Sequence, residues 1–337
     1  MQAVKGNDQT GRRNTIMLIA AFAAVYLIWG STYLAIKYAI GTIPSFMMAG
    51  VRFSVAGITL LIWARLSPSY QRPKPVHVRT AVIVGALLLA LGNGGVVIAE
   101  QYLSSSLTAL LIATVPFLIV ILSWAFMGAG RPRITVVLGL IAGFVGVTLL
   151  VLGQPAGDAA GTGSRVLGII ALAIATIGWA IGSLYGSRAE SAKPNTLAAG
   201  MQMVSGGIML LIMSAVRGEW AEFHLSAVST TSLAALAYLI FFGALIAYTA
   251  YNWLLQNASP ATVSTYAYIN PAIAVVLGWS IAGETLTGQM LVGAAIIVGS
   301  VVLITSQKRK KRETVGEEKI GRSDRQSSET QPATATA

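Results

Sequence analysis

The sequence predicts an all-α polytopic membrane protein in which ten transmembrane helices form two inverted five-helix repeats. The first observation is composition: apolar residues make up 55% of the chain and charged residues 10%, against roughly 45–50% and about 25% in ordinary globular domains. The second observation is a series of ten apolar segments, and the third is an internal repeat. Such a number of near-continuous apolar runs disfavours a soluble protein with buried helices.

Each of the ten apolar segments is about as long as a membrane-spanning helix. A helix that rises ~1.5 Å per residue needs roughly 20 residues to cross a hydrocarbon core of about 30 Å. The segments run near 15–35, 45–64, 80–99, 106–126, 135–153, 166–186, 197–216, 232–254, 262–282 and 289–306. The first segment has a partner in the repeat, so it is interpreted as a span rather than a cleaved signal peptide.

The second half of the chain repeats the first half at two constant offsets. An offset of 150 residues pairs Trp29 with Trp179, and after a short insertion an offset of 155 pairs Pro116 with Pro271. Five crossings per copy insert the second copy from the opposite side, as in secondary transporters whose substrate site lies between the halves. The expected divisions are a cytoplasmic N-terminal tail at 1–14, repeats at 15–153 and 166–306, and a disordered basic tail at 307–337.

The net charge of +11 is explained by topology rather than by a nucleic-acid partner. Most Lys and Arg residues fall in the tails and in the loops on one side of the predicted spans, whereas Lys37, Arg165 and Arg217 fall on the other. The positive-inside rule then predicts that both termini are cytoplasmic. The basic cluster at 308–312 is expected to lie against anionic lipid head groups, so membrane lipid is an expected partner.

No set of residues in the sequence is typical of an enzyme. The chain has no cysteine, its two histidines fall in predicted loops, and it has no Walker-type phosphate loop. We therefore expect no catalytic residue, no metal and no cofactor, and ATP is not the evident energy source. Coupling to a proton or other ion gradient and plain facilitated diffusion both stay open.

Small residues mark the fifth and tenth segments, where glycines recur one or two helical turns apart. They are Gly139, Gly143, Gly146, Gly293 and Gly299. Small residues let helix backbones approach closely in lipid. These segments are interpreted as structural, either through packing within one chain or through contact between the protomers of a homodimer.

Two prolines at equivalent repeat positions, Pro116 and Pro271, lie near the centres of the fourth and ninth segments. Proline in a helix interior removes one backbone hydrogen bond and clashes with the carbonyl four residues earlier. Interrupted helices in corresponding positions often lie at transporter binding sites. We interpret the pair as a hinge or as part of a cavity wall, with simple kinking as the alternative.

Polar and aromatic side chains inside the spans are the main candidates for a substrate site. Trp29, Thr32 and Tyr33 share one helix face through their i, i+3 and i+4 spacing. Each such residue alone could belong to an interfacial aromatic belt or to an interhelical hydrogen bond, but the cluster recurs on five segments. The candidates are Trp29, Thr32, Tyr33, Arg52, Asn93, Trp179, Ser183, Tyr248, Tyr251, Asn252, Tyr266 and Asn270.

Charged residues inside the predicted spans are few. Arg52 lies seven residues into the second segment, where a charge costs about 2.5–3.5 kcal/mol. It could hold a substrate carboxylate, pair with Glu100, snorkel outward or bond to backbone carbonyls. Glu100 and Glu284 lie near segment ends, and an intramembrane carboxylate is a common proton relay.

Several short motifs resemble those of the EamA-type transporters of the drug/metabolite transporter superfamily, in particular its YedA-like bacterial inner-membrane branch. The resemblance covers about residues 15–306. The motifs are WGSTY at 29–33, AGVRF at 49–53, GNG at 92–94, AE at 99–100, YAYINP at 266–271 and GETL at 283–286.

The resemblance implies ten helices in two inverted halves, a central cavity with alternating access, and peripheral fifth and tenth spans. It also implies efflux of small metabolites, such as amino acids or drugs, across a bacterial inner (plasma) membrane. The chain departs from the family at Ala129, where an acidic residue equivalent to Glu284 often stands.

Three functional hypotheses follow from the sequence. The first is a secondary transporter that exports a small metabolite, with uptake or bidirectional facilitation as the alternative direction. The second is a membrane receptor or scaffold without flux, which the absence of a sizeable soluble domain disfavours. The third is an intramembrane enzyme, which the lack of a nucleophile–base set disfavours.

Overall fold

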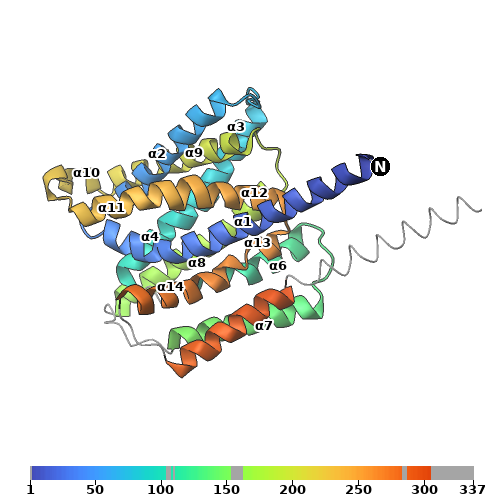
Figure 1. Cartoon of the computed structure of the whole chain (residues 1–337). Coiled ribbons are helices and arrows are strands. Elements are labelled where there is room, and N and C mark those ends of the chain that lie inside the picture. Colours follow the sequence, from blue (N-terminus) through green and yellow to red (C-terminus); the bar gives the residue numbers. More distant parts are fainter. Residues whose placement is uncertain (1, 104–107, 109–110, 153–161, 283–286, 305–337) are drawn as a thin grey trace, which may run out of the picture.

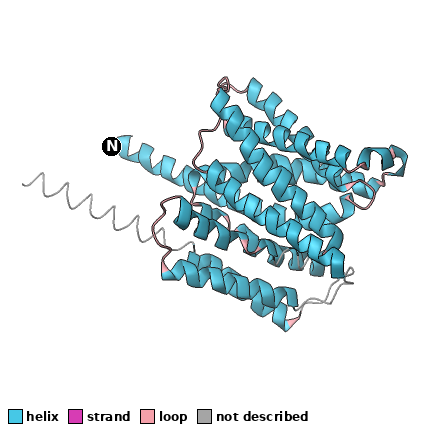
Figure 2. Cartoon of the chain, turned by 180° about the vertical axis from the view of Figure 1, so that it is seen from behind, coloured by secondary structure: helices cyan, strands magenta, loops and turns pink. Residues whose placement is uncertain are grey.

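The computed structural model describes residues 2–103, 108, 111–152, 162–282 and 287–304, and these residues form helices without any strand. Helical segments occupy all ten predicted spans within these ranges (Figures 1 and 2). Six are long and apolar enough to cross a membrane by themselves, and shorter apolar helices accompany them. The predicted polytopic all-α fold is therefore confirmed. The predicted basic tail at 307–337 and Glu284 lie outside the described residues.

The first repeat contains the helical elements up to residue 152. Its third span is continuous and passes from α-helix to π-helix and back. The elements are α1 (Gln2–Ala39), α2 (Ser45–Leu66), α3 (Pro75–Val84), η1 (Gly85–Asn93), α4 (Gly94–Tyr102), α6 (Val115–Phe126) and α7 (Ile134–Leu152). Helix α1 thus continues through most of the predicted N-terminal tail.

The second repeat follows the same order. The elements are α8 (Thr162–Gly186), α9 (Asn195–Val216), α10 (Glu219–Glu222), η2 (Leu225–Ala227), α11 (Thr230–Tyr238), η3 (Leu239–Tyr248), α12 (Thr249–Asn257), α13 (Pro260–Val263), α14 (Tyr266–Ala282) and the helix Gly288–Ile304. Here too a π-helix, η3, lies inside a continuous span, at the repeat position that η1 occupies in the first half.

Helices α2 and α9, which are equivalent in the two repeats, cross in close antiparallel contact. A Cβ atom added to Gly57 would lie 2.9 Å from the carbonyl oxygen of Gly200, and one added to Gly207 would lie 3.2 Å from that of Gly50. Gly50 on α2 therefore lies beside Gly207 on α9, and Gly57 lies beside Gly200, so the two helices run in opposite directions. Because equivalent helices run in opposite directions, the repeats are inverted, as the odd number of spans predicts.

Helix α7 and the helix Gly288–Ile304 lie together at one edge of the bundle (Figure 1). A Cβ atom at Gly139 would lie 2.7 Å from the Ile304 side chain, and one at Gly146 would lie 2.9 Å from the carbonyl oxygen of Gly293. The glycines of the fifth span thus pack within the chain, and both spans are peripheral. Gly299 faces open space.

The structure places the two prolines differently. Pro271 lies inside α14 as expected. The expectation that Pro116 interrupts a helix from its interior is wrong, because the fourth span breaks at Ala113–Thr114 and Pro116 is in the first turn of α6. The first turn tolerates proline because its N–H groups have no intrahelical acceptor. A hinge role for either proline stays a prediction.

Side chains tie the two repeats together at both ends of the α2–α9 pair. At one end, the carboxylate of Glu219 accepts hydrogen bonds from the backbone N–H groups of Phe46 (3.2 Å) and Met47 (2.9 Å), which begin α2. At the other end, Glu190 lies 3.0 Å from Nε2 of His77 and 3.3 Å from Nζ of Lys74. The hydrogen bonds from His77 and from Lys74 lower the pKa of Glu190.

We predict that Gly57→Leu destabilises the fold far more than Gly299→Leu. At Gly57 the new side chain meets the backbone of α9, and overpacking of this kind costs about 1–3 kcal/mol, whereas Gly299 has open space beside it. The free energy of unfolding in mixed detergent micelles measures the difference. Equal stability of the two variants would contradict the close crossing of α2 and α9.

Candidate functional site

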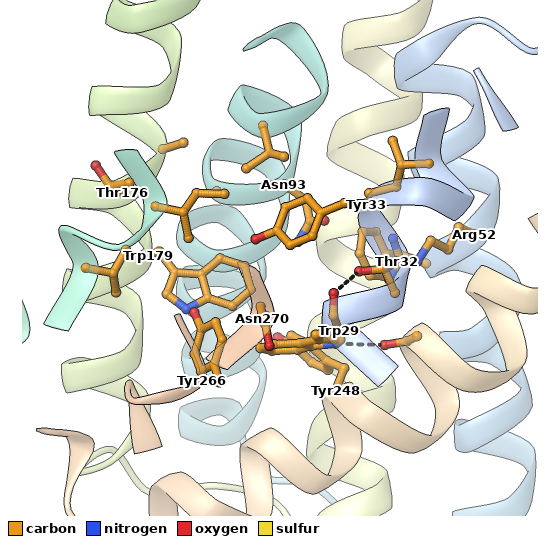
Figure 3. Close-up of a pocket in the computed structure, with 18 residues that line it drawn as sticks. Trp29, Thr32, Tyr33, Arg52, Asn93, Thr176, Trp179, Tyr248, Tyr266 and Asn270 are labelled. Carbon is orange, nitrogen blue, oxygen red and sulfur yellow. Dashed lines mark hydrogen bonds between the residues drawn. The ribbon is translucent and has the colours of Figure 1, made fainter. Parts of the chain in front are cut away.

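The side chains of both repeats enclose a cavity between the helices (Figure 3). Its empty volume is about 680 Å³, including the space at its mouth. The walls come from α1, α2, η1 and α4 of the first repeat, from Ile112 just before α6 and Val115 at its start, and from α8, η3 and α14 of the second repeat.

Most of the residues predicted from sequence lie on the wall of this cavity. Those that line it are Trp29, Thr32, Tyr33, Arg52, Asn93, Trp179, Tyr248, Tyr266 and Asn270. Their shared position is a matter of geometry, and their role in substrate binding stays a prediction. They come from six elements that lie far apart in the sequence.

The other three predicted residues, Ser183, Tyr251 and Asn252, lie behind the wall. The Tyr251 hydroxyl is 2.6 Å from Oγ of Ser183 and accepts a 3.0 Å hydrogen bond from Nε1 of Trp179. Asn252 donates its amide hydrogen bond to the backbone carbonyl of Tyr248. They support the wall and are not among the residues that line the cavity, and their role in substrate binding stays a prediction.

Three cavity-lining rings, those of Trp29, Trp179 and Tyr266, pack around the ring of Tyr251 behind them. The ring centroid of Trp29 is 5.0 Å from those of Tyr251 and Tyr266 and 5.6 Å from that of Trp179. Edge-on and tilted rings at such separations attract each other by about 0.5–1.5 kcal/mol per pair. We call Trp29, Trp179, Tyr251 and Tyr266 the aromatic floor. It closes the space between α1, α8, α12 and α14 with apolar surface.

Hydrogen bonds hold the polar members of the wall in place. Nε1 of Trp29 donates to the backbone carbonyl of Gly243 at 3.2 Å, and the Tyr248 hydroxyl donates to Oε1 of Gln202 at 3.0 Å. With the Asn270 amide oriented for hydrogen bonding, its nitrogen donates to the carbonyl oxygen of Tyr266 at 3.1 Å. These contacts fix the side chains before any ligand binds.

Each of the two π-helices contributes two wall residues, Gly92 and Asn93 from η1 and Gly243 and Tyr248 from η3. Asn93 is the last residue of η1 and Tyr248 the last residue of η3, and the two positions are equivalent in the repeats. A π-helical stretch carries more residues per turn than an α-helix and often lies at functional sites. Sequence reasoning identified both residues but not the π-helices, since no residue type marks them.

Arg52 is the one charged side chain among the residues that line the cavity. It is 5% exposed, and its Cζ atom lies 4.7 Å from the ring centroid of Phe53. A Cβ atom added to Gly243 would lie 2.7 Å from Nη2 of Arg52, so glycine makes room for the guanidinium. Among the described residues, Nε of Arg52 has no hydrogen-bond acceptor.

Sequence reasoning missed the apolar part of the wall and one hydroxyl. The missed residues are Ile36, Phe53, Gly92, Val96, Ile112, Val115, Ala175, Thr176 and Gly243. Apolar residues fill every span, so they carry no signal of their own. Thr176 lies one turn of α8 before Trp179, and that spacing is the signal that could have identified it.

Comparison with known proteins identifies the family. The model of the EamA-like transporter family matches residues 15–152 and again residues 166–306. The chain belongs to the EamA-like transporter family. It is 38% identical to the "uncharacterized inner membrane transporter YedA" of Escherichia coli K12, over 88% of this chain and 93% of that protein.

More distant relatives agree with this assignment. The "uncharacterized transporter YvbV" of Bacillus subtilis is 26% identical over 91% of this chain and 97% of its own length. A crystal structure with 21% sequence identity superposes with a TM-score of 0.69 and covers 89% of this chain and 98% of that one. The protein is therefore a multi-pass inner-membrane transporter, and the predicted resemblance to EamA-type, YedA-like transporters is confirmed.

We predict a measurable coupling between Ser183 and Tyr251, whose hydroxyl contact fixes the Trp179 indole. In a double-mutant cycle of Ser183→Ala and Tyr251→Phe, the coupling free energy should be about 0.6 kcal/mol and at most about 1.7, as for hydrogen bonds between membrane helices. Unfolding in mixed micelles measures it. Tyr38→Phe, half exposed on α1, is the control for Tyr251→Phe and should not couple to Ser183→Ala. A zero coupling for both pairs would show that the hydroxyl contact does not stabilise the wall.

Proposed function

We propose that this EamA-family protein is a secondary transporter that exports small polar or amphipathic metabolites by alternating access. Amino acids or similar compounds, and drugs, are the proposed substrate class. The observation that carries the proposal is the cavity itself, because its polar and aromatic wall is built from both inverted repeats. Transporters of inverted-repeat architecture place their substrates at such an interface.

The wall offers two kinds of surface to a substrate. The rings of Trp29, Trp179 and Tyr266 provide apolar faces on which a planar or aliphatic group can pack. Asn93 and Arg52 provide hydrogen-bond donors, and the guanidinium adds a positive charge suited to a carboxylate or another acidic group. An amphipathic metabolite satisfies both surfaces at once.

The cavity extends to one side of the aromatic floor. On α1 its wall runs from Trp29 to Ile36, toward the C-terminal end of the helix, and on α4 it includes Val96. Both helices run away from the side on which the chain begins. If the termini are cytoplasmic, as the charge distribution predicts, this conformation faces the periplasm and the aromatic floor closes the cytoplasmic side.

The proposal has alternatives in the direction of transport and in the class of protein. Uptake or bidirectional facilitation uses the same cavity, because alternating access follows the gradient of the substrate. A non-transporting receptor or scaffold is the alternative of another class, and the short connections between the described helices provide little surface for passing on a signal. No arrangement of side chains in the described cavity favours an enzyme.

Lipid, an ion and a second copy of the chain are the proposed partners besides the substrate. Large apolar side chains are exposed along α2, α7 and α9, as a lipid-facing surface requires. An ion gradient would supply the driving force in place of ATP. A homodimer is a further proposal. Gly299 lies on the peripheral helix Gly288–Ile304 with open space beside it, where a helix of a second copy would pack.

We predict that Val96→Trp strongly lowers transport and that Val145→Trp does not. Val96 lines the cavity, where an indole displaces the substrate, whereas Val145 is exposed on α7. Counterflow in proteoliposomes, with labelled amino acids, nucleosides and drugs as the panel, measures exchange across the membrane. We expect Val96→Trp to lower counterflow roughly tenfold or more, as a loss of about 1.4 kcal/mol in substrate affinity does when the substrate concentration is well below KM. Absence of counterflow for the whole panel with folded wild-type protein would contradict the proposed function.

A further inference from the structure

An oppositely charged pair lies beside the cavity without forming an ion pair. Arg52 lines the cavity, and Glu100 lies one turn after the cavity residue Val96 on the same face of α4. The helices that carry them, α2 and α4, are in contact. Among the described residues, however, the ion pairs are those of Glu190 with Lys74 and His77.

Neither oxygen of the Glu100 carboxyl group has a hydrogen-bond donor in the described part of the chain, although both oxygens are buried. Burial of an ionised carboxylate without donors costs far more than burial of the neutral acid. A buried ion pair offsets that cost only when the charged groups touch and their remaining atoms are hydrogen-bonded. Arg52 instead directs its guanidinium over the ring of Phe53 and toward Gly243.

The groups that face Glu100 are few. Arg52 approaches from α2 and Tyr33 from α1. Helix α4 also packs against α8 and η1. Residues 85–93 contain no titratable side chain, and the titratable residues of α8 are Arg165 in its first turn and Tyr185 in its last. Arg52 is the cavity-lining cation that can compensate a negative charge on Glu100, and it does so fully only from hydrogen-bond distance.

We propose that Glu100 carries a proton in this conformation and is the proton-coupling group of the transporter. The ionised form requires direct contact with the Arg52 guanidinium and hence a different arrangement of α2 and α4. When that arrangement forms, the carboxyl O–H bond breaks, the proton passes to water in the cavity, and Arg52 donates hydrogen bonds to the carboxylate. Protonation thus selects one conformation over another. The assignment rests on the proposed transport function.

Infrared difference spectroscopy of the full chain in lipid tests the protonation directly, with the proton as the only ligand. Wild-type protein should show the carbonyl stretch of a protonated carboxylic acid at neutral pH, and Glu100→Gln should lack it. Glu190→Gln is the matched control and should keep the band, since Glu190 is exposed and hydrogen-bonded by His77 and Lys74. A band that is absent from wild-type protein, or that persists in Glu100→Gln, would overturn the proposal.

Transport assays separate this proposal from the function on which it rests. Counterflow of a labelled compound from the panel needs no net proton movement, so Glu100→Gln should retain it while a pH gradient no longer drives accumulation. If a pH gradient drives no accumulation by wild-type protein that still shows counterflow, proton coupling alone is overturned, whereas wild-type protein without counterflow would overturn the transport function. Arg52→Gln is the second variant if Glu100→Gln fails to fold. In Arg52→Gln the carboxylic acid band should persist to more alkaline pH than in wild type, and an unchanged titration would contradict the role of the pair.

Discussion

The backbone contact between α2 and α9 is the constraint on which the rest of the structure depends. Glycine at Gly57, Gly200 and Gly207 lets two equivalent, antiparallel helices touch through main-chain atoms. This contact fixes the distance between the repeats, because main-chain atoms have no rotamers with which to adjust. Arg52 and Gln202 occupy equivalent positions beside the crossing. One lines the cavity and the other holds Tyr248 by a hydrogen bond, so close packing determines where the polar groups of the site lie.

The π-helices place polar side chains of this rigid frame on the cavity wall. Both repeats carry one at the same position, η1 and η3, so the irregularity belongs to the shared architecture and not to one half. The widened turns end at Asn93 and Tyr248, which both line the cavity. In η3 the backbone carbonyl of Gly243 accepts the hydrogen bond of the Trp29 indole. Non-helical or distorted backbone at membrane depth is tolerated where neighbouring side chains or a cavity satisfy its polar groups.

How far the sequence could predict this site depends on the physical origin of each feature. The spans were predictable because apolar length averages over roughly 20 residues, and Trp29, Thr32 and Tyr33 were predictable because α-helical spacing holds along α1. The π-helices, the break before Pro116 and the place of Tyr251 behind Trp29 depend on tertiary contacts that no local pattern records. Apolar wall residues such as Ile36 and Ile112 were beyond reach because the same residue types face lipid elsewhere.

The charges of the site belong to the first repeat alone. The repeat equivalents of Arg52 and Glu100 are Gln202 and Leu255, which are both neutral and buried. In the proposed alternating cycle the inverted halves exchange conformations, so a feature confined to one half has different surroundings in the two end states. Two identical halves would respond alike to the solution on either side of the membrane. An unmatched arginine and carboxyl group remove that equivalence, because moving α2 relative to α4 changes the electrostatic energy of one half and leaves the neutral pair of the other half unaffected.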